Sequence, residues 1–286
     1  MTLTLQEEEF KERRCRLICL DLDGTLLNDE KEIDPEDIRE IREASEKGIE
    51  IALVTGRMPA ATEPIAKKLG VPCILACDAG TYIEKENQCI SSEYLPIAAM
   101  RMVYMAADNF RIPLWIFRHK QWFVTGMDPV IKKEIETIHY IPRQVSMEEL
   151  VHEWEKEGIC PNKLLIGAEP ETVQKVYSRL KELRIEGIDM ACSSDHFLEI
   201  FPKGMNKGRA LELICRAQNI DPEDTYAFGD QELDIPMLEA AGTAIAMGNG
   251  IPEIKRAADF VTKTNNEAGI AHALRYFEAW NLRAQK

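Results

Sequence analysis

The chain has 286 residues, of which 45% are hydrophobic and 29% charged, a balance typical of globular proteins and not of disordered ones. A chain of this length forms either one large α/β unit or a core with a smaller second domain. Its formal net charge of −14 disfavours nucleic acid as a partner, because a negative surface repels phosphate backbones.

The cysteines and the apolar segments bear on the cellular environment. Eight cysteines are scattered along the chain and none forms a Cys-x-x-Cys pair, which favours free, reduced thiols over a disulfide framework or a zinc site. The N-terminal stretch 1–14 lacks the apolar run of a signal peptide, and no uninterrupted apolar stretch approaches the length of a membrane span. These features predict a cytoplasmic protein that does not associate with membranes.

The first third of the chain alternates strand and helix signals. Asp34 and Pro35 fit the N-cap and first position of a helix, and Gly48 fits the position after its end. Three short apolar runs are typical of buried strands, at residues 15–20, 49–54 and 71–76. This βαβαβ order predicts an α/β fold with a parallel, doubly wound, Rossmann-like sheet and right-handed crossovers.

The middle of the chain has a different character. Residues 114–117 and 121–124 resemble the arms of an aromatic β-hairpin, and Ser146 begins a capping box. Further strands are predicted at 163–167 and 197–201. This material indicates an inserted α+β domain at residues 85–200.

After the insertion the strand–helix alternation returns. Residues 224–228 and 243–246 are short apolar strands that each lead into a Gly-containing turn, and a last helix is expected at 267–280. The predicted core domain therefore consists of residues 1–84 and 201–286.

Polar residues follow the ends of three predicted strands. Asp21, Thr55 and Asp230 each come directly after the carboxyl end of a strand. In an open α/β sheet these ends line the crevice in which ligands bind. Residues far apart in the sequence are therefore expected to converge.

Asp21 and Asp23 form the first candidate cluster, in the segment Asp21 to Leu26. Two carboxylates this close can serve one pocket, where one attacks a phosphorus atom and the other handles the proton of the leaving group. Such a pair needs a cation to offset its repulsion, and Mg²⁺ suits a site made of oxygen ligands. The competing interpretation is a simple turn, because Asp and Gly are turn formers.

Thr55-Gly56-Arg57 supplies a hydroxyl and exposed backbone N–H groups at a strand–helix junction, which suits phosphate, although Thr-Gly is also an ordinary loop. In the segment from Lys203 to Gly208, either lysine could neutralise a phosphoryl group, or both could be surface lysines.

Asp230 is a candidate metal ligand directly after a strand, and Asp234 lies one helical turn further on. Asp234 also fits the N-cap of a helix with Pro236 in its first turn, and the two roles are compatible.

These segments together resemble the haloacid dehalogenase-like phosphatase superfamily, and most closely its Cof-type branch (subfamily IIB). The first motif of the family, Asp-x-Asp-Gly-Thr, matches Asp21 to Thr25, and the second matches Thr55-Gly56-Arg57. The lysine motif matches Asn206-Lys207-Gly208 after Glu199-Ile200, and the acidic motif matches Gly229 to Asp234 except at one position. The motifs span nearly the whole chain in the right order, and the resemblance selects Lys207 over Lys203.

The resemblance implies a role for each matched residue. Asp21 would be the nucleophile that forms an aspartyl-phosphate, and Asp23 would be the acid and base. Lys207 would act at the phosphoryl group, and Asp234 would orient Lys207 or a water of the metal. Mg²⁺ would be held by the carboxylates of Asp21 and Asp230 and the backbone carbonyl of Asp23. The phosphoryl oxygens would be held by Leu22 N–H, Thr55, Gly56 and Lys207, with Arg57 beside them.

Two positions depart from the family pattern. Leu233 stands where the acidic motif usually has Asn, which removes one polar contact to phosphate. Asp78 stands where the branch tends to have Asn, and a carboxylate near an anion site repels substrate unless it is paired or turned outward. Neither change touches the nucleophile, the acid/base, the lysine or the metal ligand, so activity is expected to survive.

The predicted function is therefore a Mg²⁺-dependent phosphatase for small phosphorylated metabolites, such as sugar phosphates or phosphorylated cofactors. The inserted domain would be the cap that selects the leaving group. The alternatives are a phosphomutase or dedicated sugar-phosphate phosphatase of the same superfamily, and a catalytically weakened, ligand-binding relative.

Overall fold

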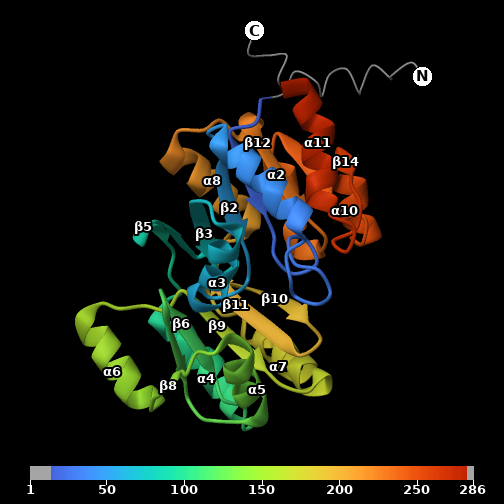
Figure 1. Cartoon of the computed structure of the whole chain (residues 1–286). Coiled ribbons are helices and arrows are strands. Elements are labelled where there is room, and N and C mark those ends of the chain that lie inside the picture. The colour runs from blue at the N-terminus through green and yellow to red at the C-terminus, as the bar shows by residue number, and fades with distance from the viewer. Residues whose placement is uncertain (1–13, 282–286) are drawn as a thin grey trace. The chain divides into compact units, whose positions relative to one another are not determined.

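The computed structural model describes residues 14–281, with the side chains of 14–277 (Figure 1). The N-terminal stretch on which the expectation of no signal peptide depends lies outside these residues, apart from Arg14. The chain divides into two compact units. Of the described residues, the first contains 14–55, 62–90 and 206–281, and the second contains 56–61 and 91–205.

The first unit is built on an eight-stranded sheet with the order β14-β13-β12-β1-β2-β3-β4-β5. Its strands are β1 (Leu17–Leu20), β2 (Glu50–Val54), β3 (Cys73–Cys77), β4 (Tyr82–Lys85), β5 (Gln88–Ser92), β12 (Thr225–Gly229), β13 (Thr243–Ala246) and β14 (Phe260–Val261). The strands from β14 to β3 are parallel, and β4 is antiparallel to β3. The prediction of a doubly wound, mainly parallel sheet is confirmed.

Helices cover both faces of this sheet. They are α2 (Pro35–Glu46), α3 (Pro59–Leu69), α8 (Lys207–Gln218), α9 (Ile235–Ala240), α10 (Pro252–Ala257) and α11 (Gly269–Asn281). Helices α2, α3 and α11 bury their apolar stripes in one core with Ile18 and Leu20 of β1. Cys19 points the other way, toward Cys215 of α8. Helices α2 and α11 lie side by side (Figure 1).

The predicted start and end of α2 are confirmed. Asp34 accepts a hydrogen bond from Glu36 N, and Pro35 is the first helical residue. Gly48 follows the helix with a φ of +85°, a conformation that Gly adopts without a steric penalty.

The second unit contains a six-stranded sheet with the order β10-β11-β9-β6-β7-β8. Its elements are α4 (Ile97–Asp108), β6 (Trp115–Arg118), β7 (Gln121–Val124), α5 (Pro129–Ile138), β8 (Arg143–Gln144), α6 (Met147–Glu157), β9 (Lys163–Gly167), α7 (Pro170–Leu183), β10 (Ile188–Ser194) and β11 (Phe197–Pro202). Helices α4, α6 and α7 share one core with the sheet, and α5 and Met58 join an aromatic cluster around Trp115 and Trp122. The aromatic hairpin is present as β6 and β7.

The division of the chain differs from the predicted boundaries in three places. Residues 201–205 belong to the second unit, because β11 continues to Pro202. Residues 85–90 belong to the first unit, because β4 and β5 extend its sheet beyond β3. Residues 56–61 belong to the second unit, because Met58 is buried among its aromatic side chains.

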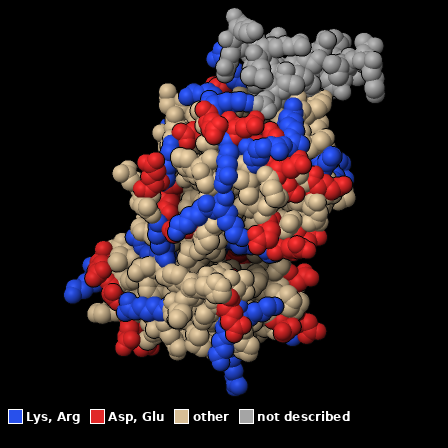
Figure 2. Space-filling model, viewed as in Figure 1, with Lys and Arg blue, Asp and Glu red and all other residues tan. Residues whose placement is uncertain are grey.

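No helix among residues 14–281 is long and apolar enough to cross a membrane. On the face seen in Figure 2, acidic and basic side chains are interspersed over the surface.

Candidate active site

The sheet of the first unit changes its direction of growth between β1 and β12. From β1 the chain adds β2 and β3 on one side, and after the second unit it adds β12 and β13 on the other. Asp21 follows β1 and Asp230 follows β12, and Asp21 N donates to Phe228 O at 3.1 Å. Ligands bind at such a switch point in open α/β sheets.

The segment after β1 turns sharply, so that Asp21 and Asp230 come close together. Leu26 N donates to Asp21 O at 3.3 Å, and Leu27 N donates to Leu22 O at 2.8 Å. Gly24 has a φ of +87°, and a Cβ on it would lie 2.4 Å from Oδ2 of Asp230. The turn therefore requires glycine for both its backbone conformation and the close approach of the carboxylate.

Three buried carboxylates meet at the switch point. Asp21, Asp230 and Asp234 each offer one oxygen, and these oxygens all lie within 4.8 Å of one another. Lys207 Nζ donates to Asp21 Oδ1 at 2.6 Å and also forms a short hydrogen bond to Asp234 Oδ1. The four residues are buried, and Asn206, whose side chain accepts from Arg209 N, caps the helix on which Lys207 is the first residue.

The charges in this cluster do not balance. Burial, then repulsion from Asp234, raises the pKa of Asp21 to about 8 although Lys207 opposes the shift. Burial also raises the pKa of Asp230. Burial alone would lower the pKa of Lys207, but Asp21 and Asp234 raise it above its usual value. One ammonium faces three carboxylates, so a divalent cation with oxygen ligands fits the cluster.

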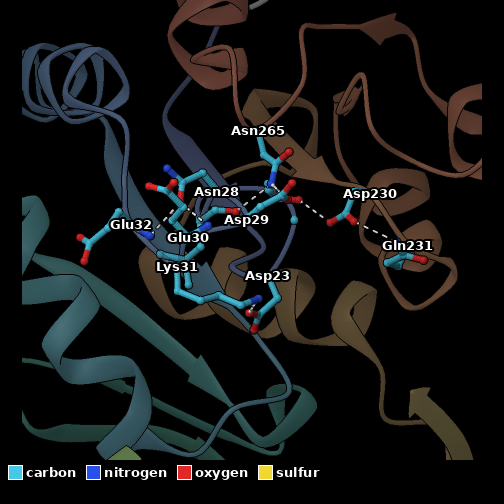
Figure 3. A network of polar contacts seen from close by, with 12 residues as sticks. Asp23, Asn28, Asp29, Glu30, Lys31, Glu32, Asp230, Gln231 and Asn265 are labelled. Atoms are coloured by element: carbon cyan, nitrogen blue, oxygen red, sulfur yellow. Dashed lines mark hydrogen bonds and ion pairs between the residues drawn. The ribbon is translucent and has the colours of Figure 1, made fainter. Parts of the chain in front are cut away.

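Each carboxylate has a fixed orientation. Thr25 Oγ1 donates to Asp230 Oδ1 at 2.9 Å, and Gln231 Nε2 donates to Asp230 Oδ2 at 3.0 Å (Figure 3). Asp234 Oδ2 accepts from the backbone N–H groups of Asp230 and Gln231 at 3.0 and 2.9 Å. These bonds hold the acids in place while they face one another.

The position of Asp234 refines its predicted role. It occupies the N-cap position of α9 but its side chain makes no cap hydrogen bond to that helix, so the N-cap interpretation is wrong for the side chain. The carboxylate turns back instead onto the loop after β12 and onto Lys207. A Cβ on Gly229 would lie 2.4 Å from Cβ of Asp234, which explains the glycine in this motif.

Asp23 is more exposed than the other acids, with 43% of its side chain accessible. Its Oδ1 accepts a hydrogen bond from Lys31 Nζ at 2.8 Å. Lys31, Thr25 and Gln231 were not among the residues predicted from the sequence. Thr25 lies within the first motif and could have been recognised there, whereas nothing in the sequence signals the contact of Lys31.

The phosphate-binding candidates fall in both units. Leu22 is buried beside Asp21, and Thr55, also buried, follows β2 with its N–H bonded to Ala76 O at 2.9 Å. Gly56 and Arg57 belong to the second unit, where Gly56 O accepts from Lys163 Nζ at 2.5 Å. Asp21, Leu22, Thr55 and Lys207 therefore belong to one unit, in which Lys207 contacts Asp21 directly.

The structure also shows where the two residues that depart from the motif pattern lie. Asp78 is buried, so it is not turned outward to solvent, and its φ of +52° belongs to a region that Asp and Asn tolerate. Leu233 is half-buried in the turn between Asp230 and Asp234.

Comparisons with known proteins agree with this geometry. The sequence model of the haloacid dehalogenase-like hydrolase family matches residues 18–274. YkrA of Bacillus subtilis (strain 168) is 30% identical over 261 residues, which cover 91% of this chain and 96% of the relative. The 5-amino-6-(5-phospho-D-ribitylamino)uracil phosphatase YcsE of the same organism is 29% identical, over 92% of this chain and 95% of the relative.

Solved structures show the same similarity. A haloacid dehalogenase-like hydrolase from Bacteroides thetaiotaomicron has a TM-score of 0.81 and 26% identity, covering 92% of this chain and 99% of that one. TM0651 from Thermotoga maritima has a TM-score of 0.79 and 29% identity, covering 91% and 97%. The chain therefore belongs to the haloacid dehalogenase-like hydrolases, in their Cof-type branch, and is a phosphoric monoester hydrolase.

Proposed function

We propose that this enzyme hydrolyses phosphate monoesters of small metabolites with Mg²⁺, through an aspartyl-phosphate on Asp21. The observation that carries the proposal is the contact of Lys207 with both Asp21 and Asp234 in a buried cluster that also contains Asp230. A lysine fixed against a carboxylate at the switch point can hold a phosphoryl oxygen while that carboxylate attacks phosphorus.

The donor set fits Mg²⁺. The carboxylates of Asp21 and Asp230 and the backbone carbonyl of Asp23 would hold the ion, and the carboxylate oxygen of Asp234 lies within the same cluster. When bound, Mg²⁺ would offset the negative charge of the carboxylates and of the phosphoryl group.

The chain's own residues would carry the steps of the reaction. An oxygen of Asp21 bonds to phosphorus as the bond to the leaving oxygen breaks, and Asp23 gives its proton to that oxygen. Asp23 then takes a proton from the water that attacks the aspartyl-phosphate, which releases phosphate and regenerates Asp21.

Other residues would bind the transferring group. Leu22 N–H, Thr55, Gly56 and Lys207 would hold its oxygens, with Arg57 beside them, and Asp234 would keep Lys207 in place. The second unit, centred on residues 91–205, would act as the cap that selects the leaving group. A small phosphorylated metabolite is the proposed substrate because relatives such as YcsE are named for one.

A panel of phosphorylated metabolites and p-nitrophenyl phosphate tests this proposal. We expect phosphate release that requires Mg²⁺ and is lost in Asp21→Asn. Formation of an isomeric phosphate ester without release would instead indicate a mutase, and an absence of turnover on every ester would indicate a ligand-binding protein.

The metal site has a separate test that needs no substrate. We expect Mg²⁺ to raise the melting temperature of the wild type, because a ligand at about 100 times its Kd stabilises a protein by about 2.7 kcal/mol. Asp230→Asn should abolish this increase. Glu232→Gln, which removes an exposed acid from the same loop, should retain it.

A further inference from the structure

The loop at residues 28–32 has a fixed conformation. Asn28 Oδ1 accepts hydrogen bonds from the N–H groups of Glu30 and Glu32 at 3.0 and 2.9 Å, and Lys31 N donates to Asn28 O at 3.0 Å. Lys31 lies in this loop with a φ of +61°. A non-glycine residue held at positive φ is uncommon and often marks a functional constraint.

The same loop is anchored to a distant segment of the first unit. The side chain of Asn266 donates to Asp29 Oδ2 at 3.0 Å and accepts from Asp29 N at 3.1 Å. The buried side chain of Asn265 donates to Leu27 O at 3.0 Å (Figure 3). The backbone at Lys31 is therefore ordered by contacts that do not involve Asp23.

From this loop the side chain of Lys31 extends to Asp23 (Figure 3), with 2.8 Å between Nζ and Oδ1. The side chains of both residues are substantially exposed, at 61% and 43%. An exposed ion pair contributes little to stability, so stability alone does not account for a loop constructed in this way.

We propose that Lys31 is a positioning residue for proton transfer, which rests on the proposed role of Asp23 as the acid and base. Lys31 holds Oδ1 of Asp23 and so fixes the orientation of the carboxyl group from which the proton passes to the leaving oxygen. An ammonium fixed at Oδ1 restricts the rotation of this carboxyl group, so less conformational freedom is lost when the group reaches the leaving oxygen.

This role predicts a dependence on the leaving group. kcat/KM reports the steps up to departure of the leaving group, and only a poor leaving group needs the proton from Asp23. p-Nitrophenolate leaves readily, whereas phenolate, with a pKa of about 10 like that of tyrosine, needs more help. The two esters differ little in size, so a binding defect would affect both alike.

The experiment measures kcat/KM of Lys31→Met for phenyl phosphate and p-nitrophenyl phosphate at saturating Mg²⁺. We expect a loss of about tenfold for phenyl phosphate, a fraction of what general acid catalysis provides, and less than about twofold for p-nitrophenyl phosphate. Lys31→Arg should restore most of the loss.

Lys68→Met is the matched control. Lys68 forms a 2.7 Å ion pair with Glu32 of the same loop, so this variant removes the same charge and keeps the contact between Lys31 and Asp23. Lys68→Met should leave kcat/KM unchanged for both esters. Three results would overturn the role of Lys31: equal losses for both esters in Lys31→Met, no loss for either ester in Lys31→Met, or the same selective loss in Lys68→Met.

Asp23→Asn separates this inference from the proposed function. If Asp23→Asn is selective for phenyl phosphate and Lys31→Met is not, the role of Lys31 alone is wrong. If Asp23→Asn slows both esters equally, the proposed acid role of Asp23 fails, and the inference about Lys31 fails with it.

Discussion

The ammonium nitrogen of Lys207 lies 2.6 Å from Oδ1 of Asp21, although 186 positions separate the two residues in the sequence. The contact is buried, and it places a fixed positive charge directly beside the proposed nucleophile. A charge fixed in this way needs no reorganisation when a phosphoryl group arrives, which is the most effective form of electrostatic catalysis.

Lys207→Met is therefore expected to lower kcat by about 10² to 10³, the usual cost of removing a fixed donor to a developing negative charge. The measurement is Mg²⁺-dependent hydrolysis of p-nitrophenyl phosphate. Lys203→Met removes an exposed lysine four positions earlier and should stay within about twofold of the wild type. Equal losses in the two variants would contradict the role of Lys207.

Gly24→Ala tests the close approach between the first turn and Asp230. The new Cβ would lie 2.4 Å from Oδ2 of Asp230, so the carboxylate must move. We expect the Mg²⁺-induced rise in melting temperature and the activity to fall together.

Gly48→Ala is the control for Gly24→Ala. Gly48 has a nearly identical φ of +85°, but nothing lies within 4 Å of its added Cβ. Both variants should lose about 1 to 2 kcal/mol of stability from the left-handed backbone, and Gly48→Ala should keep its response to Mg²⁺. If Gly24→Ala keeps that response as well, the approach to Asp230 is not needed for the site.

Asp37 should make the stability of the protein depend on pH. It is buried at the start of α2, accepts from Ala271 N at 2.7 Å, and its burial raises the pKa to about 7. The folded state therefore binds a proton more tightly than the unfolded state, whose carboxyl has a pKa of about 3.9. The stability that this proton provides is full below the unfolded value and is lost as the pH rises through about 7.

Asp37→Asn removes this titration and can retain the bond to Ala271 N. In urea unfolding, the free energy of unfolding of the wild type should fall between pH 5 and pH 8 by on the order of 2 kcal/mol more than that of the variant. Parallel changes in the two proteins would contradict the assignment.

Lys163 and Glu199 form a buried ion pair in the second unit. Their Nζ and Oε2 atoms lie 3.4 Å apart with 2% and 7% of the side chains accessible, and Lys163 Nζ also lies 4.9 Å from the centre of the Phe117 ring. Lys163→Met should lower the free energy of unfolding by about 3 to 5 kcal/mol, because it leaves the carboxylate of Glu199 buried without the ammonium group of Lys163.

The double variant Lys163→Met/Glu199→Met should recover much of that loss in urea unfolding, because no buried charge is stranded. Arg179→Met is the control. It breaks an exposed ion pair with Glu182 on α7 and should lower the free energy of unfolding by about 1 kcal/mol or less. Additive losses in the double variant would show that the two charges do not depend on each other.

The sequence was sufficient to predict the parts of the site that follow from strand order. Asp21 and Asp230 converge because parallel strands end at one edge of a sheet, and short apolar runs reveal such strands. The choice of Lys207 over Lys203 needed the family resemblance, since either lysine follows the strand.

Other features depend on contacts that no local pattern encodes. Lys31 reaches Asp23 from the loop at residues 28–32, which is anchored by Asn265 and Asn266, more than 230 positions away. Strand β5 has no buried residue and lacks the apolar run of a buried strand, so the predicted end of the core at residue 84 is too early. The packing of Met58 with the second unit depends on side chains far along the chain.

The most direct test of the central claim is mass spectrometry of the enzyme quenched in acid during turnover of p-nitrophenyl phosphate with Mg²⁺. Asp23→Asn should be included, because the loss of the proposed base slows hydrolysis of the intermediate. The account predicts one phosphoryl group on the peptide that contains Asp21, and none in Asp21→Asn. Turnover without a phosphoryl group on that peptide in either the wild type or Asp23→Asn, or sustained turnover by Asp21→Asn, would contradict it.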